Sequence, residues 1–385
     1  MKKKTKILIP SYAEDFLCIG GACKDSCCIG WNIDIDKKTF RNYFRTKNTE
    51  MKKMFFEYLY RNEKSYNNDV DYGQLAIKDS KWCPFLDEDK LCSIYKNLGE
   101  DLLSNVCYSF PRVYNVLNGV YELSLSMSCP EAVRKLLSSQ NPITFTERDL
   151  LPVKHIIHSS VDTGKKYWNK TPIKRLPELR SRSIGIIQNR SHSINERLLK
   201  LGAMLEESSQ REPITIKSKS DFKIEFFQYA IESLGVIDEI DSPVFAANTS
   251  LVLEKFVLPE NKSSKTMSDF YKEIVETVVK PFTEENAYMF ENYLVNFIYQ
   301  DNFPFSENQN MFDGYVMLIV RYTFIQFYLA GIAAQNGKLT KDDVVLMIQT
   351  HTKIINHHKT FLINLLQEIH RKQYDNREFI SLLLN

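Results

Sequence analysis

Eight cysteines are the residues of this chain whose type and spacing are best suited to chemistry. All lie in the first third of the 385 residues, and residues 130–385 contain none: Cys18, Cys23, Cys27, Cys28, Cys83, Cys92, Cys107 and Cys129. In a reducing compartment, clustered thiols act as metal ligands more often than as disulfides or as unbound buried thiols, which are the two alternatives. No histidine precedes His155. The site would therefore be all-sulfur, which suits zinc or an iron–sulfur cluster.

The first group of cysteines has the spacing C-x4-C-x3-C-C, with Gly20 and Gly21 allowing the backbone to curl tightly. Adjacent Cys27 and Cys28 fit poorly around one small tetrahedral ion, but they could serve two ions or one large cluster. The radical S-adenosylmethionine signature C-x3-C-x2-C is only half present, because Gly30 stands at the third cysteine position.

A β-hairpin is predicted to bring the last two cysteines together. Asn118-Gly119 is the strongest two-residue turn signal in the chain, and it pairs Leu117 with Val120 and Tyr114 with Leu123. Continuing this register places Tyr108 opposite Cys129, with Cys107 one step further out. The alternation after the turn predicts that Leu123 and Leu125 face inward, with Ser124 and Ser126 on the opposite face. The alternative is that the hairpin is only a structural flap.

Composition excludes several classes of protein. The chain is 43% hydrophobic and 25% charged with a net charge of +2, so it is globular and has no net attraction to nucleic acid or membrane lipid. None of its 13 glycines forms a G-x-G, which argues against a Rossmann-type dinucleotide or S-adenosylmethionine loop and against a Walker phosphate loop. The most apolar window, Val316 to Ala334, contains Arg321 and Gln326 and predicts a buried helix, not a membrane span. We expect a cytoplasmic protein.

The predicted fold is mainly α. A cysteine-rich α+β domain with a β-hairpin, residues 1–140, is followed by a larger all-helical domain, residues 141–385. Helical periodicity and caps mark residues 131–138, 193–206, 284–300 and 340–355. Hinges are predicted at 140–148 and 207–220.

Charge is unevenly distributed along this balanced chain. Residues 151–200 carry 11 Lys and Arg against 3 Asp and Glu, whereas residues 221–320 have an excess of about 11 acidic residues. Two solvated or mutually packed faces would account for this. Alternatively, the acidic segment attracts a lysine-bearing protein.

Several motifs resemble one family. The run Cys18-Ile-Gly-Gly-Ala-Cys23-Lys-Asp-Ser-Cys27-Cys28-Ile-Gly-Trp31 is similar to the opening of the flagellin lysine-N-methylases. So are Cys83-Pro-Phe-Leu86, Leu91-Cys92-Ser-Ile-Tyr95, Leu103-Ser-Asn-Val-Cys107-Tyr-Ser-Phe-Pro-Arg112 and Ser124-Leu-Ser-Met-Ser-Cys-Pro-Glu131. The cysteine region also resembles zinc- or iron-chelating cysteine-cluster domains. Weaker similarity continues through Glu196–Gly202, Glu291–Asn296 and Asn302–Phe305.

The resemblance implies methyl transfer from S-adenosylmethionine to lysine side chains of flagellin. It also implies an iron–sulfur cluster, 4Fe–4S in type with zinc as the alternative, held among the eight cysteines. Residues that bind the methyl donor are not identified. The candidates for direct participation are Tyr108, Arg112, Glu122 and Glu131, which lie on or beside the cysteine end of the hairpin. They could instead support the metal ligands. A different class of function also fits: a non-enzymatic metal-binding adaptor whose helical domain docks a partner.

Overall fold

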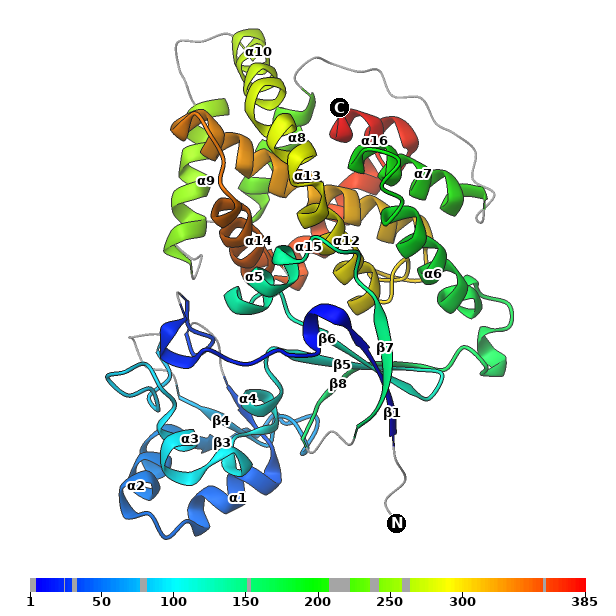
Figure 1. Cartoon of the computed structure of the whole chain (residues 1–385). Helices are drawn as coiled ribbons and strands as arrows, with labels where there is room; N and C mark the ends of the chain where they lie inside the picture. Colours follow the sequence, from blue (N-terminus) through cyan, green and yellow to red (C-terminus); the bar gives the residue numbers. More distant parts are fainter. Residues whose placement is uncertain are drawn as a thin grey trace. The chain divides into compact units, whose positions relative to one another are not determined.

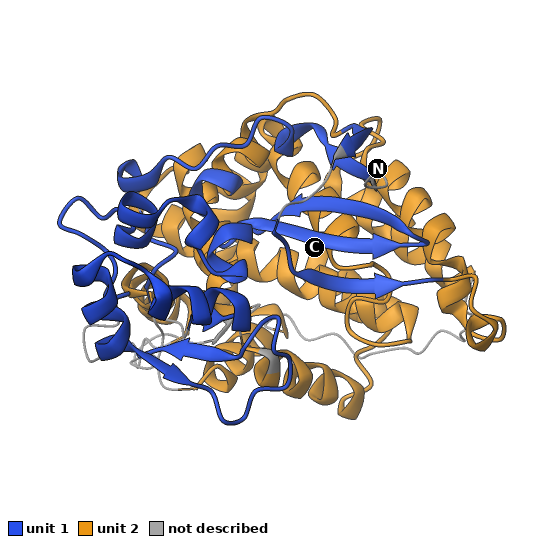
Figure 2. Cartoon of the chain, turned by 90° about the horizontal axis from the view of Figure 1, so that it is seen from below, with its two compact units in different colours: residues 1–132, 144–162 blue, residues 133–143, 163–385 orange. Residues whose placement is uncertain are grey.

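The chain forms two compact units, which Figure 2 colours separately. The computed structural model describes residues 5–23, 25–29, 33–76, 82–150, 154–207, 222–235, 242–257, 264–355 and 358–385. Unit 1 comprises residues 1–132 and 144–162, and unit 2 comprises residues 133–143 and 163–385. The boundary predicted between residues 140 and 141 falls inside the short 133–143 segment. Gly30, Trp31, His357 and most of the 207–220 hinge lie outside the described residues.

A five-stranded sheet in unit 1 contains the predicted hairpin. Its strand order is β7-β1-β6-β5-β8, and its strands are β1 (Thr5–Pro10), β5 (Arg112–Leu117), β6 (Val120–Leu125), β7 (Phe145–Leu150) and β8 (Ile157–Val161). Strand β1 runs parallel to β6 and antiparallel to β7. Strands β7 and β8 follow Pro130, where the sequence predicted only helices, and β7 overlaps the hinge predicted at 140–148. Both expectations are corrected. Edge strand β7 is largely exposed, so it lacks the apolar alternation that would have revealed it.

The hairpin register is confirmed along its length. Leu117 pairs with Val120 and Tyr114 with Leu123, and Asn118 and Gly119 both have positive φ, 52° and 80°, as a type I′ turn requires. The face opposite Leu123 and Leu125 is buried as well. Ser124 is 1% exposed, like its buried neighbours Leu123 and Leu125, so both faces of β6 are covered.

The rest of unit 1 surrounds a three-stranded sheet, β2 (Asp34–Ile35), β4 (Gly73–Leu75) and β3 (Leu59–Arg61). Its helices are α1 (Lys37–Arg45), α2 (Thr49–Tyr58), α3 (Ser93–Leu98) and α4 (Asn105–Ser109), with short 3-10 turns at Ser11–Ala13, Gly20–Ala22 and Glu100–Leu102. Stacked rings of Tyr43 and Phe55, 4.1 Å between centroids, lie in its small apolar cluster. Cys83 belongs to that cluster, and Cys28, Cys92 and Cys107 pack against it.

Helix α5 (Pro130–Ser138) begins in unit 1 and ends in unit 2. The remaining helices of unit 2 are α6 (Leu176–Ile187), α7 (Ile194–Glu207), α8 (Phe222–Ser233), α9 (Pro243–Phe256), α10 (Ser264–Ile274), α11 (Lys280–Glu285), α12 (Ala287–Gln300), α13 (Met311–Asn336), α14 (Lys341–Ile355), α15 (Lys359–Arg371) and α16 (Arg377–Leu384). Two 3-10 turns, Lys166–Trp168 and Pro172–Arg175, precede α6, and a π-helical segment, η7 (Val275–Val279), joins α10 to α11. The predicted capping box at Thr340 is present, since Thr340 Oγ1 accepts from the Asp343 N–H.

Helix α13 is the centre of unit 2 and packs against α7, α9, α10, α14 and α16 (Figure 1). It is long and apolar enough to cross a membrane, but 94% of its apolar window is buried in the protein. The one arginine in that window, Arg321, is buried and donates to Glu307 at 2.7 Å. The sequence interpretation of a core helix is consistent with this burial.

Helix α12 anchors the 133–143 segment within unit 2. Glu291 is 1% exposed and accepts from Arg190 and Arg197, both at 2.8 Å. The adjacent Asn292 amide donates to the carbonyls of Leu136 and Ser139. Because buried charged and amide groups need their partners, these contacts hold the segment in place. The predicted class, a mainly α chain with an N-terminal α+β region, is confirmed.

Candidate metal centre

Cys18 and Cys23 flank a tight turn that requires its glycines. Gly20 adopts φ +55°, and its N–H donates to Cys18 Sγ at 3.4 Å. A Cβ on Gly21 would lie 2.5 Å from the Asp89 carbonyl oxygen. The two glycines therefore let this loop pack against the turn that separates Cys83 from Cys92.

A second tight turn positions Cys83 and Cys92. Leu86 and Cys92 form an antiparallel bridge. Between them the Asp87 carboxylate accepts from the backbone N–H groups of Asp89 and Leu91 at 3.0 and 2.9 Å. Cys92 then stands at the N-cap of α3, directly before Ser93. The Asp87 carboxylate thus organises the backbone between the two thiols.

Cys28 is joined directly to Cys83 through the backbone. The Cys83 N–H donates to the Cys28 carbonyl at 2.8 Å, next to a bridge between Ile29 and Trp82. Cys27 Sγ lies 3.8 Å from Cys28 Sγ. Two cysteines distant in sequence from Cys83 are therefore held beside it.

Cys107 does not continue the hairpin, which corrects the predicted pairing of Tyr108 with Cys129. The ladder extends only to the bond from the Ser126 N–H to the Pro111 carbonyl. Before that point the chain is helical, because Ser104 caps α4 by accepting from the Cys107 N–H at 3.2 Å. Accordingly, the backbone N–H of Tyr108 donates to the Ser104 carbonyl, as in a helix, and not to a strand partner. Cys27 still lies near enough to both Cys107 and Cys129 to interact electrostatically with each.

Burial keeps most of these thiols protonated in the absence of a metal. It raises the pKa of Cys83 to about 11 and those of Cys107 and Cys129 to about 12. Backbone N–H groups oppose this effect, that of Phe85 at Cys83 and those of Glu131 and Ala132 at Cys129. Such donors stabilise a thiolate, so a metal that displaces the protons would find ligands already oriented.

The described thiols are spread more widely than the ligands of one zinc ion. The ligands of one tetrahedral zinc, with Zn–S of about 2.3 Å, lie about 3.8 Å apart. Among the described residues, no three thiols have all their Sγ atoms within 4.8 Å of one another. The Sγ atoms of Cys27 and Cys28, 3.8 Å apart, match the zinc spacing. The all-sulfur donor set, with its N–H donors, fits an iron–sulfur cluster.

The four candidate participants take different positions. The Arg112 guanidinium donates to the Phe16 carbonyl at 3.1 Å and lies 5.5 Å from the Phe16 ring centroid, which ties β5 to the segment before Cys18. Tyr108 follows Cys107 in α4, and Glu131 lies in the first turn of α5, directly after Cys129 and Pro130. Glu122 is 4% exposed and pairs with Leu8 and Asn115 inside the sheet. Three of the four thus adjoin cysteine-bearing segments, whereas Glu122 belongs to the sheet interior.

Sequence reasoning missed Asp36. Its Oδ1 accepts from the Thr39 N–H at 2.9 Å and caps α1, while its Oδ2 accepts from the Asn105 N–H at 3.1 Å, in the first turn of α4. The Asp-Lys-Lys-Thr pattern signals the first cap. Nothing local in the sequence signals the second, which links α1 to the helix carrying Cys107.

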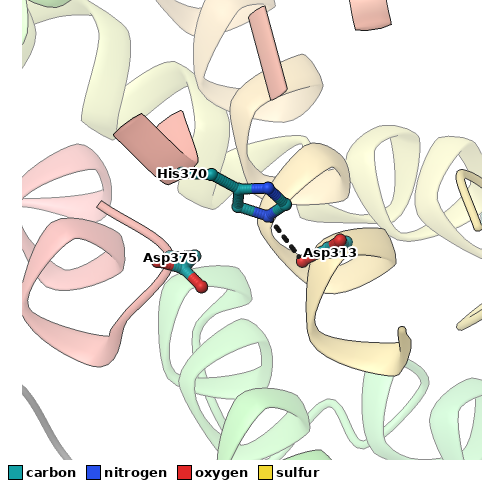
Figure 3. A group of neighbouring side chains, drawn as sticks. All are labelled: Asp313, His370 and Asp375. Carbon is teal, nitrogen blue, oxygen red and sulfur yellow. Dashed lines mark hydrogen bonds and ion pairs between the residues drawn. The ribbon is translucent and has the colours of Figure 1, made fainter. Parts of the chain in front are cut away.

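A group of three polar residues in unit 2 also has metal-ligand composition: Asp313, His370 and Asp375 (Figure 3). His370 Nε2 lies 3.0 Å from Asp313 Oδ1. The buried Asp313 carboxylate already accepts from the side-chain amides of Asn308 and Asn310 at 2.8 and 2.9 Å. These contacts make it the anchor of the loop before α13, so we assign it a structural role.

Two family models match the chain. The FliB lysine N-methylase C-terminal domain covers residues 180–383, and a proposed zinc- or iron-chelating domain, CxxCxxCC, covers residues 17–130. The first spans more than half of the chain. The chain therefore belongs to the FliB lysine N-methylase family, as the motifs indicated, and is a protein-lysine methyltransferase.

Particular relatives agree with this assignment. The chain is similar to the lysine-N-methylases of Salmonella choleraesuis (strain SC-B67) and Salmonella typhimurium (strain LT2). Each is 24% identical over 375 residues, covering 90% of both chains. The flagellar biosynthetic protein FliU of Salmonella muenchen is 30% identical over 166 residues, which cover 43% of this chain and 96% of that protein. No solved structure matches this chain.

Proposed function

We propose that this protein transfers methyl groups from S-adenosylmethionine to lysine side chains of flagellin in the cytoplasm, and that its N-terminal cysteines bind an iron–sulfur cluster. Membership of the lysine methylase family supports the reaction, and the flagellar relative supports the substrate. The observation that carries the cluster is the set of four thiols around one apolar core, with backbone N–H groups donating to the sulfurs of Cys83 and Cys92.

The inner ligands are Cys28, Cys83, Cys92 and Cys107, since these four share the apolar cluster of unit 1. The other four, Cys18, Cys23, Cys27 and Cys129, serve as outer thiols; of these, Cys18 and Cys27 are exposed. A bound cluster would supply a charged and redox-active centre on these thiolates. The methyl transfer itself balances without it.

In that transfer, the lysine must first lose a proton, because its ammonium form, with a pKa of about 10.4, has no free electron pair. The neutral amine then attacks the sulfonium methyl in line. The new C–N bond forms as the S–CH3 bond breaks, and the electron pair stays on sulfur to give S-adenosylhomocysteine. The methylated ammonium releases a proton before any further transfer.

Tyr108 and Glu131 act as positioning residues, because each lies within two residues of a cysteine. Arg112 holds the preceding loop through Phe16. Glu122 and Glu131 are the two carboxylates among the four, and both are buried. We assign the role of proton acceptor to Glu122, which does not adjoin a cysteine. The Glu122→Gln variant keeps the shape of that side chain and removes its basicity.

Mass spectrometry of unmodified flagellin incubated with the anaerobically prepared protein tests the reaction. We expect mass increments of one methyl group on lysines, dependent on S-adenosylmethionine. Unchanged flagellin in the presence of fully metallated protein would favour the adaptor function. The metal is tested separately by iron and sulfide content and by visible absorbance bleached by dithionite.

Matched serine variants test the ligand assignment. Cys83→Ser should remove most of the iron, whereas Cys18→Ser, at an exposed outer thiol, should retain most of it. Equal loss in both variants would contradict the inner set. Stoichiometric zinc without iron would exclude the cluster but preserve the thiolate site.

A further inference from the structure

Unit 2 contains a cavity that none of the cysteines reaches. Its volume is about 730 Å³, and it lies between α7, α8, η7, α13 and α16. Small-molecule sites commonly measure about 300–1,000 Å³, so it is large enough for a dinucleotide-sized or smaller ligand. All residues that line it belong to unit 2.

One wall of the cavity is the π-helical segment Val275–Val279. The cause lies just beyond it, because Pro281 lacks an N–H and its ring would collide with the Thr277 carbonyl in a regular α-helix. Widening the turn avoids that collision and turns Val275 and Val279 toward the cavity. Single π-turns of this kind occur frequently at functional sites.

Lys223 supplies an unpaired positive charge to the cavity. Its Nζ lies 5.7 Å from the Tyr271 ring centroid, and both residues line the space. No carboxylate of the described part of the chain forms an ion pair with it. Burial alone lowers the pKa of this amine to about 8. An anionic group on a ligand would remove the cost of that isolated charge.

The other lining groups indicate the rest of the ligand. Tyr271 and Tyr322 are buried aromatic rings, whose faces attract flat rings and sulfonium cations. The Gln326 Nε2 is buried with no hydrogen-bond partner among the described residues. The exposed Glu284 carboxylate also lines the space, and would repel a polyphosphate but attract an ammonium group. The neighbouring Glu276 carboxylate is paired with Lys280 at 2.9 Å.

We propose that this cavity binds the methyl donor, S-adenosylmethionine, with its carboxylate at Lys223 and its sulfonium and base against Tyr271 and Tyr322. This rests on the proposed function, and it adds that the donor site lies in unit 2 and is built without the cysteines. S-adenosylmethionine carries one carboxylate, which complements Lys223. Its sulfonium and flat base complement the aromatic rings, and its ammonium group complements the Glu284 carboxylate.

The other side-chain cations that line the cavity are already paired, Arg190 and Arg197 with Glu291 and Lys280 with Glu276. A nucleoside phosphate would therefore find Lys223 and the aromatic rings but would face the Glu284 carboxylate.

Calorimetric titration of the metallated full-length protein with S-adenosylhomocysteine, the unreactive product, tests this proposal. Lys223→Met should weaken binding at least tenfold. Lys223→Arg, which keeps the charge, should bind within a few-fold of the unmodified protein. Lys272→Met is the matched control, since Lys272 is exposed on α10 beside Tyr271 and does not line the cavity. Circular dichroism checks that each variant is folded.

Three results would overturn the proposal. The first is unchanged binding in Lys223→Met, and the second is loss of binding in Cys83→Ser with unit 2 still folded, which would place the donor at the metal centre. The third is tighter binding of adenosine triphosphate than of S-adenosylhomocysteine. The flagellin assay separates the two hypotheses. Lys223-dependent binding without methylation contradicts the proposed function alone, whereas methylation with Lys223-independent binding contradicts only the cavity assignment.

Discussion

The Asp36 carboxylate accepts hydrogen bonds from the N-terminal turns of two helices. Each oxygen accepts from the first turn of a different helix, α1 and α4, and α4 carries Cys107. Because the side chain is 4% exposed, water cannot readily replace it.

Asp36→Ala should therefore lower the free energy of unfolding by about 1–3 kcal/mol, as expected for loss of a cap and one further buried hydrogen bond. It should also lower iron content, because α4 would no longer be held to α1. Denaturant titration and iron analysis measure the two effects. Asp36→Asn keeps an oxygen that can accept from Thr39 but presents an amide N–H to the N–H of Asn105. Its free energy of unfolding should therefore lie between those of the unmodified protein and Asp36→Ala. Full stability in Asp36→Ala would show that the double cap is unimportant.

Lys223 predicts a pH dependence for ligand binding. Its pKa is lowered to about 8 by burial, so the ammonium form that attracts a carboxylate disappears as pH rises through 8. Affinity for S-adenosylhomocysteine should fall about tenfold from pH 7 to pH 9. The arginine variant should show a much flatter profile. The other charged groups lining the cavity are Arg190, His192, Glu196, Arg197, Glu276, Lys280 and Glu284, and the neighbouring phenols of Tyr271 and Tyr322 have raised pKa values because they are buried. A steep profile in Lys223→Arg would assign the effect to one of them.

At the scale of elements, the Asn118-Gly119 turn determines the register of the central hairpin. Gly119 has φ +80°, and a Cβ there would contact nothing within 4 Å. A side chain at this position would therefore clash with no neighbour, and its cost would come only from the left-handed backbone conformation. Gly185 in α6 has the same open surroundings without a positive φ, which makes it a matched comparison.

Gly119→Ala should destabilise the protein by about 1 kcal/mol, because a side chain disfavours left-handed backbone. Gly185→Ala should stabilise it by about 0.5–1 kcal/mol, because alanine loses less entropy in a helix. Chemical denaturation of both variants measures the difference. Effects of the same sign would contradict the assignment of conformational strain to Gly119.

Local signals account for the elements that sequence reasoning predicted. The turn dipeptide, the capping box at Thr340 and the apolar run of α13 each act within a few residues, so they are readable in a single sequence. The sequence predicted that Cys107 continues the hairpin strand. Cys107 lies instead in a short helix that Ser104 caps. Strands β7 and β8, the second bond of Asp36 and the isolation of Lys223 depend on residues distant in the chain. The cavity therefore could not be predicted from the sequence, whereas the cysteine site could.

At the scale of the whole molecule, the two units differ in what stabilises them. Unit 1 has a small apolar cluster that includes Cys83 with three more cysteines packed against it, and small cores commonly depend on a metal. Unit 2 is built around a helix almost entirely buried along its length.

Calorimetry should accordingly show two unfolding transitions, and removal of metal by a chelator should lower only one of them. Gly202→Ala should lower the other, because a Cβ there would lie 2.4 Å from the Tyr315 hydroxyl inside unit 2. A single transition that moves equally under both treatments would indicate that the units unfold together.

The route of the chain between the units has a consequence for proteolysis. The backbone passes from one unit to the other at three places, after residues 132, 143 and 162. One cut at any of these passages leaves two covalent connections intact, so the units stay attached. A cut at residue 140 would in addition divide the 133–143 segment, leaving its 133–139 part on the N-terminal fragment but still held by Asn292. We therefore expect nicked protein to run as two bands under denaturing conditions and to elute as one species in native buffer.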